Sequence, residues 1–279
     1  MNRIIINIFC LLITLGINIP SFGQINKVIT YNIKYDNPKD SLNNWNNRKK
    51  ELVNLFKYYE PDIFGIQEGL EHQLNYIDLN LVNYSRIGVG RDDGKHKGEF
   101  SPIYYDRNKF SLIEESTFWL SDQDDSVSIG WDASMERICT YGIFENKTNQ
   151  KKIFVLNTHF DHKGPIAREE SSKLILSKIK GFNKNNYPVI LMGDFNAEPE
   201  SKPIRILKKE LIDGAELSKD GIYGPDGTYT GFTKNVFAKR RIDYIFIKNM
   251  KVKKYRHIDD KMKNNNYLSD HLPVLIEFK

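Results

Sequence analysis

Short apolar runs separated by polar turns constrain the fold of this 279-residue chain more than any other feature. The runs are short for helices and rich in Ile, Val, Leu and Phe, which is typical of buried β-strands. They are Val28–Ile33, Ile63–Ile66, Pro102–Tyr105, Ile138–Phe144, Ile153–Asn157, Val189–Met192, Ile242–Ile247 and Leu272–Phe278. A chain with this many strands has to bury them in sheets.

Two other segments have the spacing of amphipathic helices. Apolar side chains recur at helical intervals at Leu52, Leu55, Phe56 and Tyr59, and again at Leu174, Ile175, Ile179 and Phe182. Each helix presents one apolar stripe, which must pack on something else. We therefore predict an α/β (α+β) four-layer sandwich, in which two packed, mostly antiparallel β-sheets are flanked by helices.

The first residues differ in composition from the rest of the chain. Arg3 is followed by an apolar run from Ile4 to Ile19, and small residues stand at Ser21 and Gly23. This order predicts a signal peptide over residues 1–23 that is cleaved before Gln24. A transmembrane anchor is the alternative, but the run is short for a bilayer span. We expect a secreted or periplasmic protein with no stable membrane anchor.

Residues 24–279 are predicted to form one catalytic domain, because no internal repeat or low-complexity linker divides them. We expect this domain to be a monomer. The formal net charge is +5, and without Arg3 it becomes +4, which is modest for a partner of nucleic acid. Cys139 is then the remaining cysteine, so an internal disulfide is excluded. It lies in an apolar run and is predicted to be a buried strand residue.

Polar side chains that suit chemistry follow the apolar runs repeatedly. Any one of them has a simpler explanation, because Asn and Asp form turns and a histidine beside a strand is usually hydrogen-bonded. The end of a strand is nevertheless a rigid place from which to position a catalytic side chain. The residues in question are Asn32, Glu68, Asn157, His159, Asp194, Asn196, Asp243, Asp270 and His271.

Short sequence motifs carry these residues, and their order resembles that of the endonuclease/exonuclease/phosphatase superfamily, which has the pancreatic-type deoxyribonuclease fold. The resemblance covers residues 27–278. The motifs are Thr30-Tyr31-Asn32-Ile33, Gln67-Glu68, Asn157-Thr158-His159, Gly193-Asp194-Phe195-Asn196, Arg241-Ile242-Asp243-Tyr244-Ile245 and Ser269-Asp270-His271-Leu272-Pro273-Val274. The resemblance implies a metal-dependent phosphoesterase that hydrolyses phosphate esters by in-line attack of an activated water.

The resemblance also implies a site for Mg²⁺, with Mn²⁺ as the other candidate ion. Mg²⁺ prefers oxygen ligands and keeps several waters. Glu68 supplies such an oxygen, and by analogy Asn32 and Asp270 complete the metal ligands.

The catalytic residues implied are Asp194, Asn196, His271, His159, Asp243 and Asn157. Asp194 is expected to deprotonate the water, and Asn196 to lie on the same face if the turn between them stays extended. His159 and His271 are expected to donate hydrogen bonds to the developing oxyanion. Asp243 fixes the tautomer of His271. The alternative makes His271 the base and Asp194 a second metal ligand.

Arginine binds phosphate in a fork geometry, so Arg91, Arg137 and Arg168 are further candidates for phosphate contacts. A zinc hydrolase using His159, Asp161 and His162 is a competing interpretation, although no His-Glu-x-x-His motif is present. A non-catalytic phosphate-binding module is another. Retention of Glu68, Asp194 and His271 argues against it.

The substrate stays open between a small molecule, a lipid head group and nucleic acid. A secreted endo- or exonuclease would use a basic stripe formed by Lys239, Arg240, Arg241, Lys248, Lys251, Lys253, Lys254 and Arg256. Against it, the polar segment Ser121–Glu136 carries Asp122, Asp124, Asp125 and Asp132, and acids beside the site would repel a duplex. We therefore favour a small or exposed phosphate ester.

Overall fold

The computed structural model describes residues 27–233 and 238–278. The predicted signal peptide over residues 1–23 and its cleavage site lie outside these residues. In the described part of the chain, no helix is both long and apolar enough to cross a bilayer.

One sheet has seven strands in the order β10-β12-β13-β1-β2-β4-β3. Most neighbours run antiparallel, and the pairs β1–β2 and β10–β12 are parallel. The strands of this sheet are β1 (Lys27–Asn32), β2 (Ile63–Gln67), β3 (Tyr84–Ile87), β4 (Ile103–Asp106), β10 (Ile222–Tyr223), β12 (Val252–His257) and β13 (Val274–Phe278).

The second sheet has six strands in the order β5-β6-β7-β8-β11-β9, and only β7 and β8 run parallel in it. Its strands are β5 (Phe110–Trp119), β6 (Ile138–Asn146), β7 (Lys152–His159), β8 (Val189–Asp194), β9 (Ile212–Asp213) and β11 (Asp243–Lys248). Cys139 is buried within β6, as its apolar run predicts.

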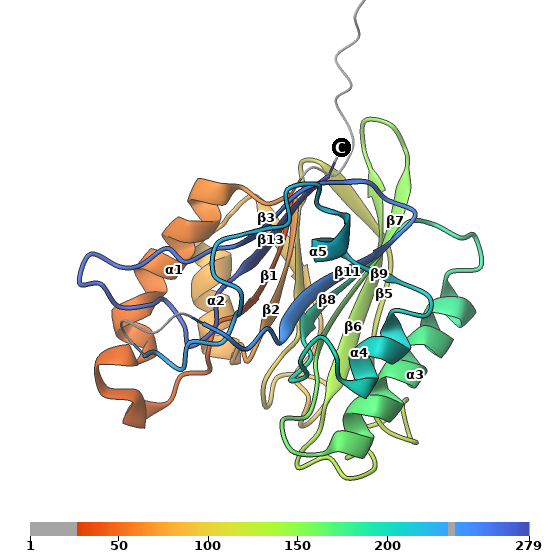
Figure 1. Cartoon of the computed structure of the whole chain (residues 1–279), viewed down its shortest axis with the longest axis horizontal. Coiled ribbons are helices and arrows are strands. Elements are labelled where there is room, and N and C mark those ends of the chain that lie inside the picture. Colours follow the sequence, from red (N-terminus) through yellow and green to blue (C-terminus); the bar gives the residue numbers. More distant parts are fainter. Residues whose placement is uncertain (1–26, 234–237, 279) are drawn as a thin grey trace, which may run out of the picture.

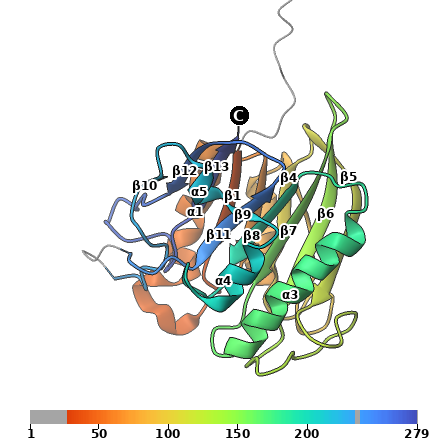
Figure 2. The ribbon, with the colours of Figure 1, turned by 45° about the vertical axis from the view of Figure 1, so that its right-hand side comes forward.

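The helices cover the outer faces of both sheets. Figure 1 shows α1 (Trp45–Tyr59) and α2 (Glu71–Asn80) on one side, and α3 (Pro165–Phe182) with α4 (Lys202–Leu207) on the other. Figure 2 shows α3 and α4 lying over the six-stranded sheet. The remaining helices are short: η1 (Pro38–Asn43) and α5 (Gly214–Leu217).

Three apolar cores hold these layers together. One lies between α1, α2 and the seven-stranded sheet, and a second between α3, α4 and the six-stranded sheet. The third fills the space between the sheets, where Val28 and Ile276 face Val155 and Ile245. The predicted four-layer sandwich is confirmed. Each sheet packs on helices with one face and on the other sheet with the opposite face.

The sequence patterns missed several elements. The edge strand β5 carries Glu114 and Glu115 among its exposed residues, so it has no continuous apolar run. In β12, the exposed Lys253 and Lys254 interrupt the apolar pattern. Helix α2 was overlooked because only its buried residues Gln73, Leu74 and Ile77 face the core. An edge element buries less apolar surface, so its sequence signal is weaker.

Candidate active site

The polar strand ends predicted from the sequence converge at one edge of the sandwich. Strands β1 and β2 run parallel, as do β7 and β8, so their carboxyl ends meet there. A pocket of about 560 Å³ opens at this place. It is lined by Lys34, Tyr35, Glu68, Arg91, Glu99, Met135, Arg137, His159, His162, Asp194, Asn196, Tyr229, Arg240, Ile242, Asp270 and His271.

Asp194 lies at the centre of the pocket and is only 1% exposed. Its carboxylate accepts hydrogen bonds from the side chain of Asn32 at 3.0 Å and from the backbone N–H of Asn196 at 2.9 Å. Burial and the nearby charge of Asp243 raise the pKa of Asp194 to about 7. A carboxylate with this pKa can accept a proton near neutral pH, which is what a general base requires.

Gly193 lets Asp194 take this position. Its φ of +150° suits glycine, and a Cβ there would lie 2.1 Å from the carbonyl oxygen of Thr158 on β7. Only glycine allows β8 to approach β7 so closely. The Gly-Asp-Phe-Asn motif therefore has a structural as well as a chemical explanation.

His271 joins the two buried aspartates. Its Nδ1 lies 2.9 Å from Oδ2 of Asp243, and its Nε2 lies 3.7 Å from Oδ2 of Asp194. Thr228 donates a further hydrogen bond to Asp243, at 2.5 Å. Burial alone would lower the pKa of His271, but the two carboxylates outweigh it and raise that pKa well above its usual value. His271 therefore holds a proton between two acids.

The same three residues are a candidate metal site. One ligand atom from each of Asp194, Asp243 and His271 lies within 4.8 Å of the others. In the described residues this is the one grouping of three or more such side chains. A protonated imidazole cannot bind a metal, so this use would require His271 to lose its proton.

A second acidic pair forms beside Asp194. Nζ of Lys34 lies 3.5 Å from Oε2 of Glu68 and 3.7 Å from Oδ2 of Asp270. Burial acts to raise the pKa of Glu68, but the charges of Lys34 and His271 outweigh it and hold that pKa below its usual value. Asn32 donates to the other oxygen of Glu68 at 3.0 Å. Two largely buried carboxylates that already share one cation form an oxygen-rich site of the kind that suits Mg²⁺.

Glu68 has an unusual backbone conformation, with a φ of +60° that side-chain-bearing residues rarely adopt. Such strain persists where the surroundings fix it, and it is concentrated at functional sites. Here the backbone N–H of Tyr35 donates to Oε2 of Glu68 at 3.1 Å. The strained backbone thus directs the carboxylate into the pocket.

His159 and Asn196 form the side of the pocket next to Asp194. The amide nitrogen of Asn196 lies 3.1 Å from Nε2 of His159 and donates to the carbonyl of Phe160 at 3.0 Å. Because the amide nitrogen of Asn196 can only donate, Nε2 of His159 accepts, and the proton of the neutral imidazole is on Nδ1. Burial, with the charges of Arg137 and Arg91, lowers the pKa of His159 well below its usual value, so this histidine is neutral.

The expectation of an extended turn between Asp194 and Asn196 is wrong. Asn196 has a φ of +46°, in the left-handed region that asparagine tolerates. The left-handed residue turns the amide toward His159. The two side chains still meet in one pocket, but through a turn and not through strand alternation.

Asn157 lies away from the other candidates. It is fully buried between the sheets, where its amide donates to the carbonyls of Ile66 and Pro102, both at 2.8 Å. Its side-chain oxygen accepts from Gln67 at 2.6 Å. A Cβ on Gly65 would lie 2.7 Å from Asn157, so the fit is tight. These contacts link β7 to β2 across the sandwich, and Asn157 does not line the pocket.

Two arginines, Arg91 and Arg137, line the pocket as well. Arg91 makes a two-point ion pair with Glu99, at 2.8 and 3.1 Å. Arg137 contacts Asp161 at 3.4 Å and Nδ1 of His162 at 3.0 Å. Nε of Arg91 and Nη1 of Arg137 are buried with no hydrogen-bond partner among the described residues. Buried donors without partners are costly, so an anion such as a phosphate group would satisfy them.

Arg168, the third arginine candidate, donates to the carbonyl of Asp161 at 2.8 Å and does not line the pocket. Of the three residues in the zinc interpretation, Asp161 is already hydrogen-bonded to the backbone. The carboxylate of Asp161 accepts from the backbone of Ser134, Lys163 and Gly164. These bonds hold the loop that carries His162 and leave the carboxylate little capacity for a metal.

The proposed basic stripe is divided among different parts of the molecule. Arg240 lines the pocket, whereas Arg241 pairs with Asp213 at 2.6 Å and Lys248 with Glu210 at 3.2 Å. The acids of the Ser121–Glu136 segment are divided in the same way: Asp132 accepts from the first turn of α3, and Asp124 pairs with Lys178. Neither set forms a single charged surface at the pocket.

Several residues at the pocket escaped the sequence patterns. Glu99 and Tyr229 follow no apolar run, and Lys34, directly after the run Val28–Ile33, belongs to none of the motifs. Tyr229 lies 5.1 Å from the ring of His271, edge to face, and reaches it from a segment with no regular structure. Lys34 could have been noticed as a cation two residues after Asn32.

Two packed sheets with carboxylates, histidines and arginines gathered in a pocket at one edge are the arrangement expected of a phosphoesterase. A model of the Endonuclease/Exonuclease/phosphatase family matches residues 29–271, and the chain belongs to that family. The resemblance predicted from the motifs is therefore confirmed.

Solved structures of the family resemble this chain along most of its length. A mannosyl-6-phosphatase of Bacteroides thetaiotaomicron is 38% identical, with a TM-score of 0.87, and the match covers 91% of this chain and 99% of that one. An endonuclease/exonuclease/phosphatase from Bacteroides vulgatus is 36% identical, with a TM-score of 0.86, covering 92% and 99%. A probable RNA exonuclease of Saccharomyces cerevisiae is 31% identical over 60% of this chain, which spans only 35% of the yeast protein's length.

Proposed function

We propose that this protein is a Mg²⁺-dependent phosphatase that releases phosphate from a small sugar phosphate. The observation that carries the chemistry is Asp194, a buried carboxylate whose pKa of about 7 makes it a proton acceptor beside a protonated histidine. The similarity to a mannosyl-6-phosphatase, at 38% identity over nearly the whole of both chains, supports the substrate class.

Glu68 and Asp270, which the Lys34 ammonium now contacts, would hold the metal ion, with Asn32 beside them. Mn²⁺ fits the same oxygen ligands. The bound ion would neutralise negative charge on the phosphate oxygens during transfer. The described residues supply the carboxylate oxygens that such an ion requires.

The residues of the pocket can perform the remaining steps. Asp194 takes the proton from a water that attacks phosphorus in line with the leaving oxygen. Asn196 and His159 orient that water from the same side of the pocket. His271 donates a hydrogen bond from Nε2 to the phosphate oxygen that gains charge, and Asp243 holds the proton on its Nδ1.

The alternative in which His271 is the base is weaker in this geometry. Its raised pKa means that the imidazole already carries both protons at neutral pH. A protonated imidazole can donate but cannot accept. Asp194 is the group left with the capacity to take a proton.

We further propose that the protein is exported, through the signal peptide predicted over residues 1–23. Export would separate the enzyme from chromosomal DNA, which supports a small ester as the substrate. A secreted nuclease is the second candidate, favoured by the similarity to a probable RNA exonuclease. A phosphate-binding module without activity is the third, and the intact arrangement of Glu68, Asp194 and His271 argues against it.

The test is a comparison of substrates with purified protein in Mg²⁺. We expect release of phosphate from mannose 6-phosphate, and little cleavage of plasmid DNA, RNA, sphingomyelin or a chromogenic phosphodiester. The Asp194→Asn variant controls for contaminating phosphatases. Rapid cleavage of plasmid or RNA with no turnover of sugar phosphates would establish the nuclease instead.

A further inference from the structure

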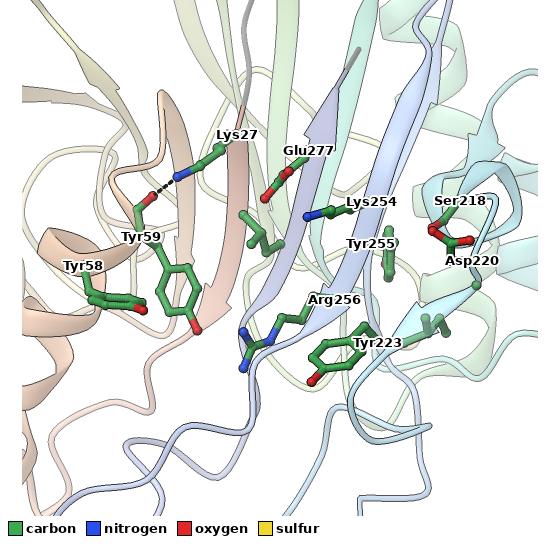
Figure 3. Close-up of a pocket in the computed structure, with 13 residues that line it drawn as sticks. Lys27, Tyr58, Tyr59, Ser218, Asp220, Tyr223, Lys254, Tyr255, Arg256 and Glu277 are labelled. Atoms are coloured by element: carbon green, nitrogen blue, oxygen red, sulfur yellow. Dashed lines mark hydrogen bonds between the residues drawn. The ribbon is translucent and has the colours of Figure 1, made fainter.

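A second hollow of about 570 Å³ lies away from the active site, on the outer face of the seven-stranded sheet (Figure 3). Its floor is formed by β12 and β13, and its walls by the end of α1 and by the turn and strand at residues 218–223. Strand β1 begins at Lys27 in this groove and ends at Asn32 in the active site. At about 3.3 Å per residue, the two places are roughly 16 Å apart along the strand.

Exposed tyrosine rings flank the groove on both sides. Tyr58 from α1 is 80% exposed, and Tyr223 from β10 is 73% exposed. In Figure 3 Arg256 lies between Tyr59 and Tyr223, with its guanidinium 5.7 and 5.5 Å from the two ring centroids. An exposed aromatic ring beside a hollow offers a flat apolar face with a polar hydroxyl to a ligand. The arginine fixes the spacing of the two walls.

The floor offers polar groups that no neighbour uses. In the sheet register Glu277 lies between Lys27 and Lys254 on adjacent strands. The ammonium of Lys27 donates to the carbonyl of Tyr59 at 3.0 Å. Among the described residues, Glu277, Lys254 and Asp220 have neither an ion pair nor a side-chain hydrogen bond. The groove therefore presents free carboxylates and a free ammonium between aromatic walls.

We propose that this groove binds a neutral oligosaccharide. The C–H faces of sugar rings can pack on the exposed tyrosines, while hydroxyl groups donate to Glu277 and Asp220 and accept from Lys254. The lining mixes acids and bases, and the aspartates at 259 and 260 partly neutralise Arg256. Carboxylates within the groove disfavour a nucleic-acid strand, which binds where basic charge is continuous.

The groove would hold the sugar chain of a large substrate or anchor the enzyme to a polysaccharide. The choice of mannose among the probes below rests on the proposed function, whereas the groove itself requires only a chain of neutral sugars. Unphosphorylated probes separate the two proposals, because they offer no phosphate group to the active site.

The experiment is isothermal titration of the purified protein with mannotetraose, xylotetraose, cellotetraose and maltotetraose. We expect at least one to bind, and binding to weaken about tenfold in Tyr223→Ala and in Tyr58→Ala. Turnover of mannose 6-phosphate should stay unchanged in both variants. Leu79→Ala, which removes an exposed side chain from α2, is the matched control and should bind as the unmodified protein does.

Failure of all four oligosaccharides to bind would overturn the proposal. So would binding that survives the Tyr58→Ala/Tyr223→Ala double variant, or binding of single-stranded DNA that those substitutions weaken in place of sugar binding. Failure of the proposed function has a different signature, since mannose 6-phosphate would then go unhydrolysed whatever the groove binds.

Discussion

The active-site pocket and the tyrosine-lined groove occupy different parts of the sandwich. The charged side chains of the pocket are buried and paired, whereas several of those in the groove are exposed and unpaired. In the pocket, Asp194, Asp243 and His271 are almost fully buried and lie against one another, and the pKa values of Asp194 and His271 are both raised well above the usual ones. In the groove, Lys254 and Asp220 are exposed and unpaired. Coupled buried charges suit proton transfer, whereas separate solvated ones suit recognition.

Removal of metal should have the largest effect, because it should stop phosphate release at the pocket and leave oligosaccharide binding at the groove unchanged. Without an ion to neutralise charge on the phosphate oxygens, excess EDTA should abolish phosphate release, and added Mg²⁺ or Mn²⁺ should restore it. The measurement is phosphate release in parallel with oligosaccharide titration, which EDTA should leave unchanged. Full activity in excess EDTA would contradict the metal requirement, and better restoration by zinc would favour the zinc interpretation.

Asp194→Asn should lower kcat by about 10²–10⁴-fold, because the amide cannot take the proton from water. The matched control is Asp220→Asn in the groove, an exposed aspartate that should leave kcat unchanged while weakening sugar binding. Steady-state kinetics and circular dichroism on both variants provide the comparison. An Asp194→Asn enzyme that keeps more than about half of its rate would remove this residue from the mechanism.

Asn157→Ala should act on stability more than on chemistry. It would remove one donor each from the carbonyls of Ile66 and Pro102 and an acceptor of the Gln67 amide inside the sandwich, which we expect to lower the free energy of unfolding by about 2–4 kcal/mol. Chemical denaturation measures the change, with the exposed Asn54→Ala on α1 as control. A kcat loss as large as that of Asp194→Asn, without destabilisation, would make Asn157 catalytic after all.

The smallest expected effect is the contribution of His257 to the pH dependence of the free energy of unfolding. It faces inward from β12, where Nδ1 lies 2.7 Å from the carbonyl of Pro225, and burial lowers its pKa to about 4. Its unfolded pKa is about 6.5, so the unfolded state binds the proton more readily. The free energy of unfolding should therefore fall, by at most about 3 kcal/mol, as pH is lowered from 7 to 4.

His257→Gln should remove that part of the pH dependence, as measured by denaturation at a series of pH values. The exposed His96→Gln is the control and should retain it. An unchanged slope in His257→Gln would mean that other groups account for the acid sensitivity.

The sandwich could be predicted from the residues alone, and so could many of the side chains that the structure places at the pocket. The apolar runs fixed the central strands, because a buried strand must be apolar on both faces. The polar residues at their ends then fell together, since parallel neighbours such as β1 and β2 end at the same edge. The candidate metal ligands and catalytic residues, from Asn32 to His271, could be named from the sequence motifs.

Which of these residues share a pocket depends on contacts that form only when the sheets pack together. Asn157 and His159 belong to one motif and one strand, yet one side chain joins the two sheets and the other lines the pocket. Tyr229 reaches the site from a segment without a periodic pattern, and the groove brings α1, β1, β10, β12 and β13 together. Local patterns report which side of a strand is buried, whereas a site depends on contacts between residues far apart in the chain, which only folding creates.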